Sequence, residues 1–251
     1  MLNSFRSTCL LLIIVYMLST LGDTLAPKST RQSQRSFTRC LQNKKVSFAL
    51  TWGPSEKTNS LLDAFKAKDK KAVLLVNPNM VNENNKQLIR DAFSKSQTVG
   101  MQIPLWPEEL AAMSALEFAT RLKEFADRIS VAMNFAGQFP KYIRIPNISK
   151  DICLIDTTPM IQIANAMGFV VIQNTKGNGD LLKVEDASIM TNYMADNLGY
   201  IFSIEDSETN TVDGSAVAQI LASAEGQGYS IVPINECVGL SAESSLKTCT
   251  I

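Results

Sequence analysis

The stretch "KKVSFALTWGPSEKT", residues 44–58, decides the fold because it holds a complete strand-to-helix connection. Residues 46–50 form a strand-like run, and Gly53-Pro54 ends it because proline cannot donate a ladder hydrogen bond. Residues 55–59 then offer side chains that cap a helix with an apolar face of Leu61, Leu62 and Phe65. Trp52, one of two tryptophans in the chain, stands at the end of the strand. In α/β proteins the residues that do chemistry are usually found there.

The same strand-then-helix alternation continues to residue 234. After 46–50, strands are predicted at 72–76, 98–103, 142–145, 169–172, 200–204 and 230–234. Helices are predicted at 86–94, 115–136, 158–167, 187–197 and 216–225, with a break at Pro104 and Pro107 and a loop at 176–180. Repeated β-then-α units predict an α/β domain with a mainly parallel sheet, either doubly wound or closed as a barrel. Its functional residues should lie at the carboxyl ends of the strands.

The first 26 residues differ from the rest, because Arg6 precedes an apolar run at 9–18 and small and polar residues follow. This layout is typical of a secretory signal peptide, although an uncleaved anchor is the alternative. We therefore expect a signal peptide at 1–26, a basic polar segment at 27–43, one main domain at 44–240 and a tail at 241–251. The exported chain should have no membrane span after signal cleavage, because no later apolar stretch is long enough.

Composition excludes several classes of function. Acidic and basic residues each number 24, so the overall charge gives no reason to expect a nucleic-acid partner. The chain has no histidine, which rules out Ser-His triads, Cys-His dyads and zinc held by imidazole. Four cysteines remain after signal removal, and their pairing is open on residue spacing alone: Cys40, Cys153, Cys237 and Cys249.

Five motifs in order resemble the polysaccharide deacetylases with the NodB homology domain, also called carbohydrate esterase family 4, and the fungal chitin deacetylase branch above all. "KKVSFALTWGPSEKT" aligns with the family's T-F-D-D-G-P motif, and "VGMQIPLWPEELAAMSALEF" (99–118) with I-G-N-H-T-x-S-H-P. "YIRIPN" (142–147) is similar to R-P-P-Y, "GYIFSIED" (199–206) to L-H-D, and "GYSIVPINECVGL" (228–240) to the closing strand. The resemblance implies a single-domain, distorted (β/α) barrel with fewer than eight regular strands. It also implies a disulfide bond between Cys40 and Cys237.

The same alignment implies that the catalytic residues have been lost. Active members use an Asp and two His to hold a metal, a second Asp as base and a His as acid, so that an amide carbonyl is polarised and water is activated. Here the base position is Thr51, the metal positions are Trp52, Gln102 and Trp106, and the acid position is Glu205. Arg144 remains, and it can orient a carboxylate, bind ligand or form a structural ion pair.

No cofactor is expected at this site. Glu205, Asp206, Asp151 and Asp156 could offer oxygens to a hard cation, but two indoles would stand where the metal and its water belong, and an indole has no lone pair to donate. Aromatic rings at these positions either fill the old cavity or stack on sugar rings, and we favour filling as the commoner use of an aromatic side chain.

We therefore predict a pseudoenzyme that is secreted to a cell or spore wall and is associated with chitin-like polysaccharide or other wall components. Its ligand-binding residues would be Trp52, Gln102, Trp106, Arg144 and Glu205. Two alternatives stay open. One is an active hydrolase that removes N-acetyl groups with a non-standard site, and the other is a structural wall or surface protein that has no sugar site.

Overall fold

The structure is a computed structural model, and it describes residues 36–95, 97–134, 138–146, 157–175, 180–181, 194–241 and 246–248. Residues 34–248 form one compact unit. The expected signal peptide, most of the basic segment, residues 187–193 of the helix predicted at 187–197, Asp151, Asp156, Cys153 and Cys249 lie outside the described residues. Within the described ranges, no helix is both long and apolar enough to cross a membrane.

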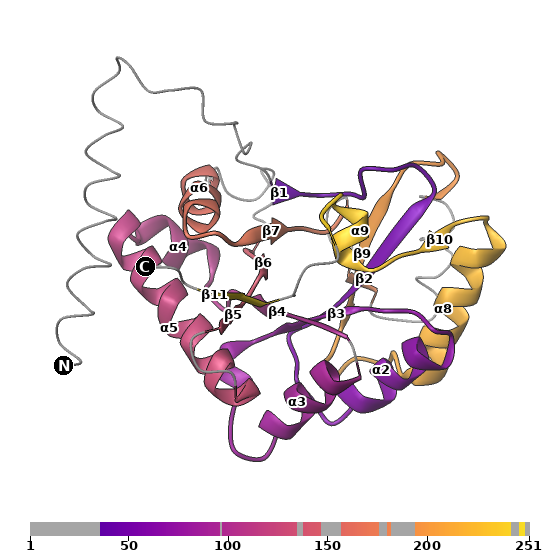
Figure 1. Ribbon diagram of the computed structural model, residues 1–251, viewed down its shortest axis with the longest axis horizontal. Helices are drawn as coiled ribbons and strands as arrows, with labels where there is room; N and C mark the ends of the chain where they lie inside the picture. The colour runs from indigo at the N-terminus through magenta and orange to yellow at the C-terminus, as the bar shows by residue number, and fades with distance from the viewer. Residues whose placement is uncertain are drawn as a thin grey trace. The chain divides into compact units, whose positions relative to one another are not determined.

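In the described part of the chain, nine parallel strands form one curved sheet (Figure 1). Its longer strands are β2 (Lys45–Thr51), β3 (Val73–Val76), β4 (Thr98–Gln102), β6 (Tyr142–Arg144), β7 (Val170–Ile172) and β9 (Tyr200–Glu205). Three strands of two residues complete it: β1 (Ser36–Phe37), β8 (Asp180–Leu181) and β10 (Ser230–Ile231). The order is β1-β7-β6-β4-β3-β2-β9-β8, and β10 pairs with the start of β2.

Helices follow most strands and cover the outer face of the sheet (Figure 1). They are α2 (Thr58–Ala67), α3 (Lys86–Ser94), α4 (Pro107–Ala112), α5 (Ala115–Met133), α6 (Thr158–Ala166) and α8 (Gly214–Gly226), with a 3₁₀ turn η1 (Pro78–Met80) after β3. The short α9 (Ile234–Cys237) differs, because its Ile234 and Cys237 pack on the inside of the curve. Because the strands run parallel, each helix returns the chain to the amino edge of the sheet.

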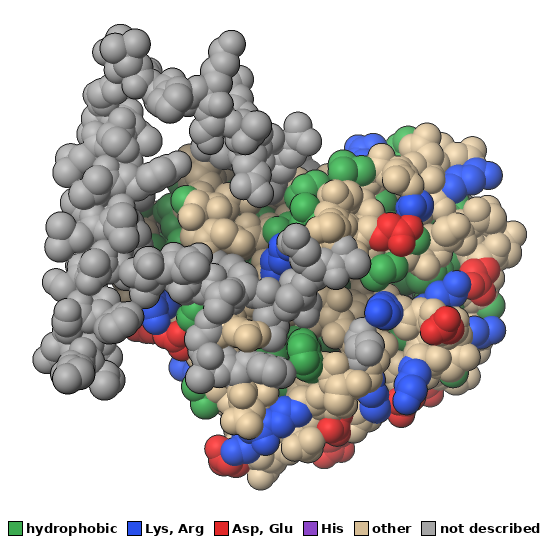
Figure 2. All heavy atoms as spheres, in the orientation of Figure 1, with side chains coloured by type: hydrophobic (Ala, Val, Ile, Leu, Met, Phe, Trp, Pro, Cys, Tyr) green, Lys and Arg blue, Asp and Glu red, His purple; other side chains and the backbone are tan. Residues whose placement is uncertain are grey.

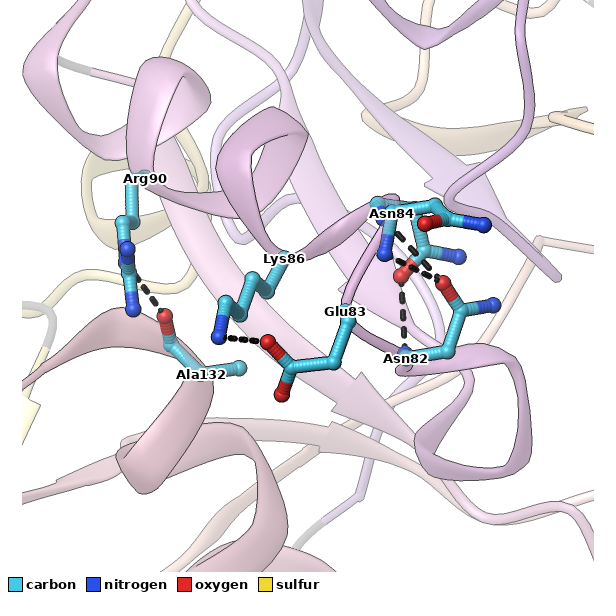
Figure 3. Close-up of polar contacts among 7 residues, drawn as sticks. Asn82, Glu83, Asn84, Lys86, Arg90 and Ala132 are labelled. Atoms are coloured by element: carbon cyan, nitrogen blue, oxygen red, sulfur yellow. Dashed lines mark hydrogen bonds and ion pairs between the residues drawn. The ribbon is translucent and has the colours of Figure 1, made fainter.

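Polar contacts order the start of α3, and one of them joins α3 to α5 (Figure 3). The Asn82 Oδ1 accepts the backbone N–H of Asn84 at 2.9 Å just before α3 begins. Lys86 in the first turn of α3 pairs with Glu83, and Arg90 Nε donates to the Ala132 carbonyl at 2.8 Å. The last of these bonds satisfies a carbonyl near the end of α5 that has no partner within its helix.

Both faces of the sheet are buried, as expected for parallel strands covered by helices. On the outer face, Val46, Phe48 and Leu50 join one hydrophobic cluster with the helices. Alternate residues point into the curve of the sheet, where a second cluster forms, which includes Ala49, Val73, Leu75, Tyr142, Ile172 and Ile201. The inside of the curve is therefore a packed core below the carboxyl ends of the strands.

The structure contains the disulfide bond between Cys40 and Cys237 that the resemblance implied, with 4.4 Å between the Cα atoms. The Leu41 N–H also donates to the Cys237 carbonyl at 2.8 Å. These contacts join the segment before β2 to α9, near the amino end of the sheet.

The half-barrel of parallel strands confirms the predicted fold, and several elements differ from the pattern analysis. A helix, α4, forms at 107–112 where only a break was expected, because proline is well suited to the first position of a helix. The predicted strand at 230–234 ends at Ile231, and Ile234 begins α9 after Pro233. Two further strands pair in antiparallel fashion, β5 (Gln138–Pro140) and β11 (Leu246–Thr248), the second from the expected tail.

Candidate functional site

The register of the strands brings four of the predicted site residues to the carboxyl edge in two pairs. Thr51 pairs with Glu205 across β2 and β9, and Gln102 pairs with Arg144 across β4 and β6. Residues paired in register point to the same face of a sheet. Since Thr51 is also in register with Leu75 of the inner cluster, the Thr51–Glu205 pair faces the inside of the curve.

Arg144 reaches across the inside of the curved sheet. Its Nη1 donates to Ser203 Oγ of β9 at 3.5 Å, although β4, β3 and β2 separate β6 from β9 along the sheet. The Ser203 hydroxyl also bonds to Asn174 Oδ1, which lies just after β7. Pattern analysis missed Asn174 and Ser203. The available signal was period-two alternation, because Ser203 and Glu205 continue the inward face of Ile201.

Next to Asn174, Thr175 ties β7 to β9. Its backbone N–H donates to the Ile201 carbonyl at 2.9 Å, and its Oγ1 accepts the Ile201 N–H at 2.8 Å. The end of β7 is therefore joined to β9 at the level of Ile201, and the sheet is nearly closed there.

Trp52 lies in a tightly bonded turn directly after β2. Its backbone φ is +70°, in the left-handed region that non-glycine residues rarely adopt. The Gly53 carbonyl accepts the Asn77 N–H at 2.7 Å, which joins this turn to the end of β3. Thr51, Gly53, Pro54 and Ser55 are buried, but the Trp52 side chain is 36% exposed.

Trp106 precedes α4 and is 71% exposed. Its backbone N–H donates to Glu109 Oε2 at 2.6 Å, so the contact that fixes this position uses the main chain and leaves the indole in solvent. The favoured interpretation, in which both indoles fill the old cavity, is wrong for Trp106 and unsupported for Trp52. Packing in a cavity would bury the rings, whereas Trp106 is 71% exposed and Trp52 is 36% exposed.

Asp206 is the buried carboxylate of the site, at 1% exposure. Its Oδ1 accepts the Ser55 hydroxyl at 2.5 Å and its Oδ2 accepts the Thr58 hydroxyl at 2.6 Å. Burial raises the pKa of the Asp206 carboxyl, and the two hydroxyl donors oppose that rise. The side chain turns toward the start of α2, away from the partly exposed Glu205, so the two neighbouring carboxyl groups do not form a pair across a substrate.

The residues present do not fit the metal that the resemblance implies. Of the three metal positions, only Gln102 carries a lone-pair donor, and its side chain is 1% exposed with Oε1 lacking a hydrogen-bond partner among the described residues. Asp206 is committed to Ser55 and Thr58. In the described ranges, no three Cys, Asp or Glu side chains gather as metal ligands do.

Charges of both signs are mixed over the face of the molecule shown in Figure 2. The ion pairs at the surface include Lys45 with Glu236 at 2.7 Å and Lys95 with Asp63 at 2.9 Å. Exposed pairs of this kind add little to stability.

No protein-family model matches the sequence, and no curated protein matches it either. Solved structures do match. The chain is similar to the chitin deacetylase from the fungal pathogen Colletotrichum lindemuthianum, with 22% identity, a TM-score of 0.68, and coverage of 85% of this chain and 96% of that one. It is also similar to a CE4 family pseudoenzyme from Bacillus anthracis, with 18% identity, a TM-score of 0.62, and coverage of 82% and 69%.

A mutant of that pseudoenzyme, described as having restored enzymatic activity, matches with 19% identity, a TM-score of 0.62, and coverage of 82% of this chain and 71% of that one. These likenesses confirm that the chain has the NodB-type (β/α) barrel fold of the CE4 deacetylases.

Proposed function

We propose that this chain is a catalytically degenerate homologue of the polysaccharide deacetylases that binds polymers of N-acetylglucosamine. The observation that carries the proposal is the exposure of Trp52 and Trp106, the only tryptophans in the sequence, just after the carboxyl ends of β2 and β4. In this fold the ligand site lies at that edge. Indole rings stack on the apolar faces of sugars, and the exposed surface of each of these two indoles is available for such stacking.

The loss of catalysis is argued from side-chain chemistry. The position that corresponds to the base carries Thr51, whose hydroxyl does not accept a proton near neutral pH. Its Oγ1 lies 3.5 Å from the Ile204 carbonyl, to which it donates. Glu205 is the remaining partly exposed carboxylate of the predicted site set. A single carboxylate without a second acid or base is a poor basis for amide hydrolysis.

Export and association with a cell or spore wall belong to the same proposal. The disulfide between Cys40 and Cys237 supports an oxidising environment, and the layout of residues 1–26 supports secretion. Wall association rests on the proposed polysaccharide ligand.

Titration with N-acetylglucosamine oligomers tests the binding proposal by Trp fluorescence and by calorimetry. Trp52→Ala and Trp106→Ala should each weaken binding about tenfold, the equivalent of about 1.4 kcal/mol of stacking. Leu41→Ala is the matched control, because Leu41 is 58% exposed and precedes β2 at the opposite edge of the sheet. An unchanged spectrum and no heat of binding at millimolar oligomer would favour the structural wall protein.

An acetate-release assay on chitin oligomers tests the degenerate site. We expect no release by the wild-type chain with or without added zinc. The positive control restores the family's residues together, with Thr51→Asp, Trp52→Asp, Gln102→His, Trp106→His and Glu205→His, and should release acetate with zinc. Metal-dependent release by the wild-type chain would support the active, non-standard hydrolase instead.

A further inference from the structure

The turn that carries Trp52 has an unusual combination of backbone conformation and exposure. A left-handed conformation in a non-glycine residue is unfavourable by about 1–2 kcal/mol, and Trp52 adopts it at φ +70°. The Trp52 side chain is 36% exposed, so only part of its surface gains packing that could offset this strain. Strained residues persist where the surrounding structure over-determines them, and they cluster at sites of function.

Asp206 makes two hydrogen bonds that hold the turn in this conformation. Its backbone N–H donates to the Thr51 carbonyl at 2.7 Å, on one side of Trp52. Its carboxylate accepts the Ser55 hydroxyl at 2.5 Å, on the other side. Asp206, which directly follows β9, thus holds both ends of the five-residue turn 51–55. Trp52 is the one residue of this turn whose side chain is exposed.

The carboxylate also fits tightly against the middle of the turn. A Cβ added at Gly53 would lie 2.1 Å from Asp206 Oδ2, so the backbone approaches the carboxylate more closely than any other residue type would allow. On the far side of Gly53, its carbonyl accepts the Asn77 N–H at 2.7 Å. The turn is therefore held between β9 and the end of β3.

We infer that Asp206 is a positioning residue, which fixes the left-handed turn so that Trp52 is presented as a rigid stacking surface for the polysaccharide. This inference rests on the proposed function, because it names the residue on which sugar binding at Trp52 depends. Rigid presentation matters for affinity, since an indole that is already ordered loses less conformational entropy on binding.

The hydrogen bonds around Asp206 indicate which substitutions should preserve its role. In Asp206→Asn, the amide oxygen can still accept the Ser55 hydroxyl, and the amide nitrogen can donate to Thr58 Oγ1. The Thr58 hydroxyl can then donate to the Ser55 carbonyl, which lies 2.9 Å away. Asp206→Ala has neither possibility, so it should release the turn.

The experiment is made in a Trp106→Phe background, where Trp52 is the only tryptophan. Asp206→Ala should shift the Trp52 emission to longer wavelength, raise its quenching by acrylamide, and weaken binding of an N-acetylglucosamine tetramer about tenfold. Asp206→Asn should restore emission, quenching and affinity to within about twofold of the background protein. Asp213→Ala is the matched control, since Asp213 caps α8 through the Ala216 N–H at 2.9 Å and should leave all three readouts unchanged.

The outcomes separate the two proposals. If the wild-type protein binds no oligomer, the proposed function fails and this inference fails with it. If it binds, but Asp206→Ala retains the emission, quenching and affinity of the background, only the positioning role is overturned. Should Asp206→Ala not fold, Ser55→Ala removes the hydroxyl bond alone, and the same readouts must move in the same direction.

Discussion

The inside of the curved sheet has two levels that differ sharply. The lower level, toward the amino edge, is apolar and includes Ala49, Val73, Tyr142, Ile172 and Ile201. The upper level, at the carboxyl edge, is polar and includes Thr51, Gln102, Arg144, Asn174, Ser203 and Glu205. The lower level is the kind of core that any chain with this fold needs, whereas the upper level consists of polar side chains and includes residues of the proposed ligand site. Scaffold and chemistry are thus encoded by different residues, and one can change without the other.

The largest expected effect comes from breaking the lower level. Ile201→Ala removes a fully buried side chain from the inner cluster and should lower the free energy of unfolding by about 2–5 kcal/mol. Ser203→Ala is the matched variant, because Ser203 lies two residues further along the same strand and face, and it should lower this free energy by only about 1 kcal/mol. Urea unfolding measures both. Equal losses would show that the polar level is as important to stability as the core.

Removal of the disulfide should cause the next largest loss in the free energy of unfolding. Cys40 and Cys237 are 197 residues apart in sequence, so the bond restricts nearly the whole domain in the unfolded state. Cys40→Ala combined with Cys237→Ala should lower the free energy of unfolding by about 2–4 kcal/mol. Oligomer affinity should not change at a temperature where the variant is folded, because the bond lies at the opposite edge from Trp52. A loss of affinity in the folded variant would contradict the separation of the two levels.

A substitution at Gln102 should have a smaller effect, and it should raise the free energy of unfolding. Its Oε1 is buried and lacks a hydrogen-bond partner among the described residues, and an unsatisfied buried acceptor is unfavourable by about 1–3 kcal/mol. Gln102→Met replaces the amide with an apolar group of similar size and should raise the free energy of unfolding by about 1 kcal/mol. Thermal unfolding measures the change.

The functional meaning of Gln102 follows from the same variant. If Gln102→Met is more stable and binds oligomers less well, the polar level is retained for ligand at the expense of stability. A stabilised variant with unchanged affinity would remove Gln102 from the proposed binding residues. Loss of stability would show that the amide has a partner in the folded chain after all.

Much of the fold could be predicted because local patterns agree with it. Strand-then-helix alternation and the five motifs indicate a parallel barrel, and β2, β3 and α3 lie within a residue of their predicted bounds or match them. Helix α4 was missed because Pro104 and Pro107 were interpreted as a break, although Pro107 occupies the first helical position and Glu109 caps the N-terminus.

Less of the candidate site could be predicted, because exposure and backbone conformation depend on neighbours that are distant in sequence. Tryptophan is not a residue from which a left-handed turn would be expected, and the contacts that hold Trp52 there come from Asp206 and Asn77. The exposure of Trp106 depends on how the loop before α4 leaves the sheet. Residue identity at these positions therefore indicated the loss of a metal site, but not whether the indoles fill it.

The smallest expected effect is on the pH dependence of stability. Its sign tests how burial affects Asp206, the carboxylate that holds the turn under Trp52. Burial raises the pKa of the Asp206 carboxyl above its ordinary value of 3.8. Because the folded-state pKa is the higher one, this group's contribution to stability is complete below pH 3.8 and is lost as the pH rises through the folded-state value. The stability of the wild type relative to Asp206→Asn should therefore fall as the pH rises from below 3.8 towards neutrality.

Glu117 on the surface supplies a control of opposite sign. Hydrogen bonds from the Ser114 hydroxyl and then its backbone N–H lower the pKa of Glu117 below 4.5, so its contribution is present above that value and is lost as the pH falls. The stability of the wild type relative to Glu117→Gln should rise with pH over the same series of urea unfolding experiments. If both comparisons rise with pH, the Ser55 and Thr58 hydroxyls outweigh the burial of Asp206. The carboxylate would then stabilise the turn under Trp52 in its charged form, and Asp206→Asn would no longer be a conservative replacement.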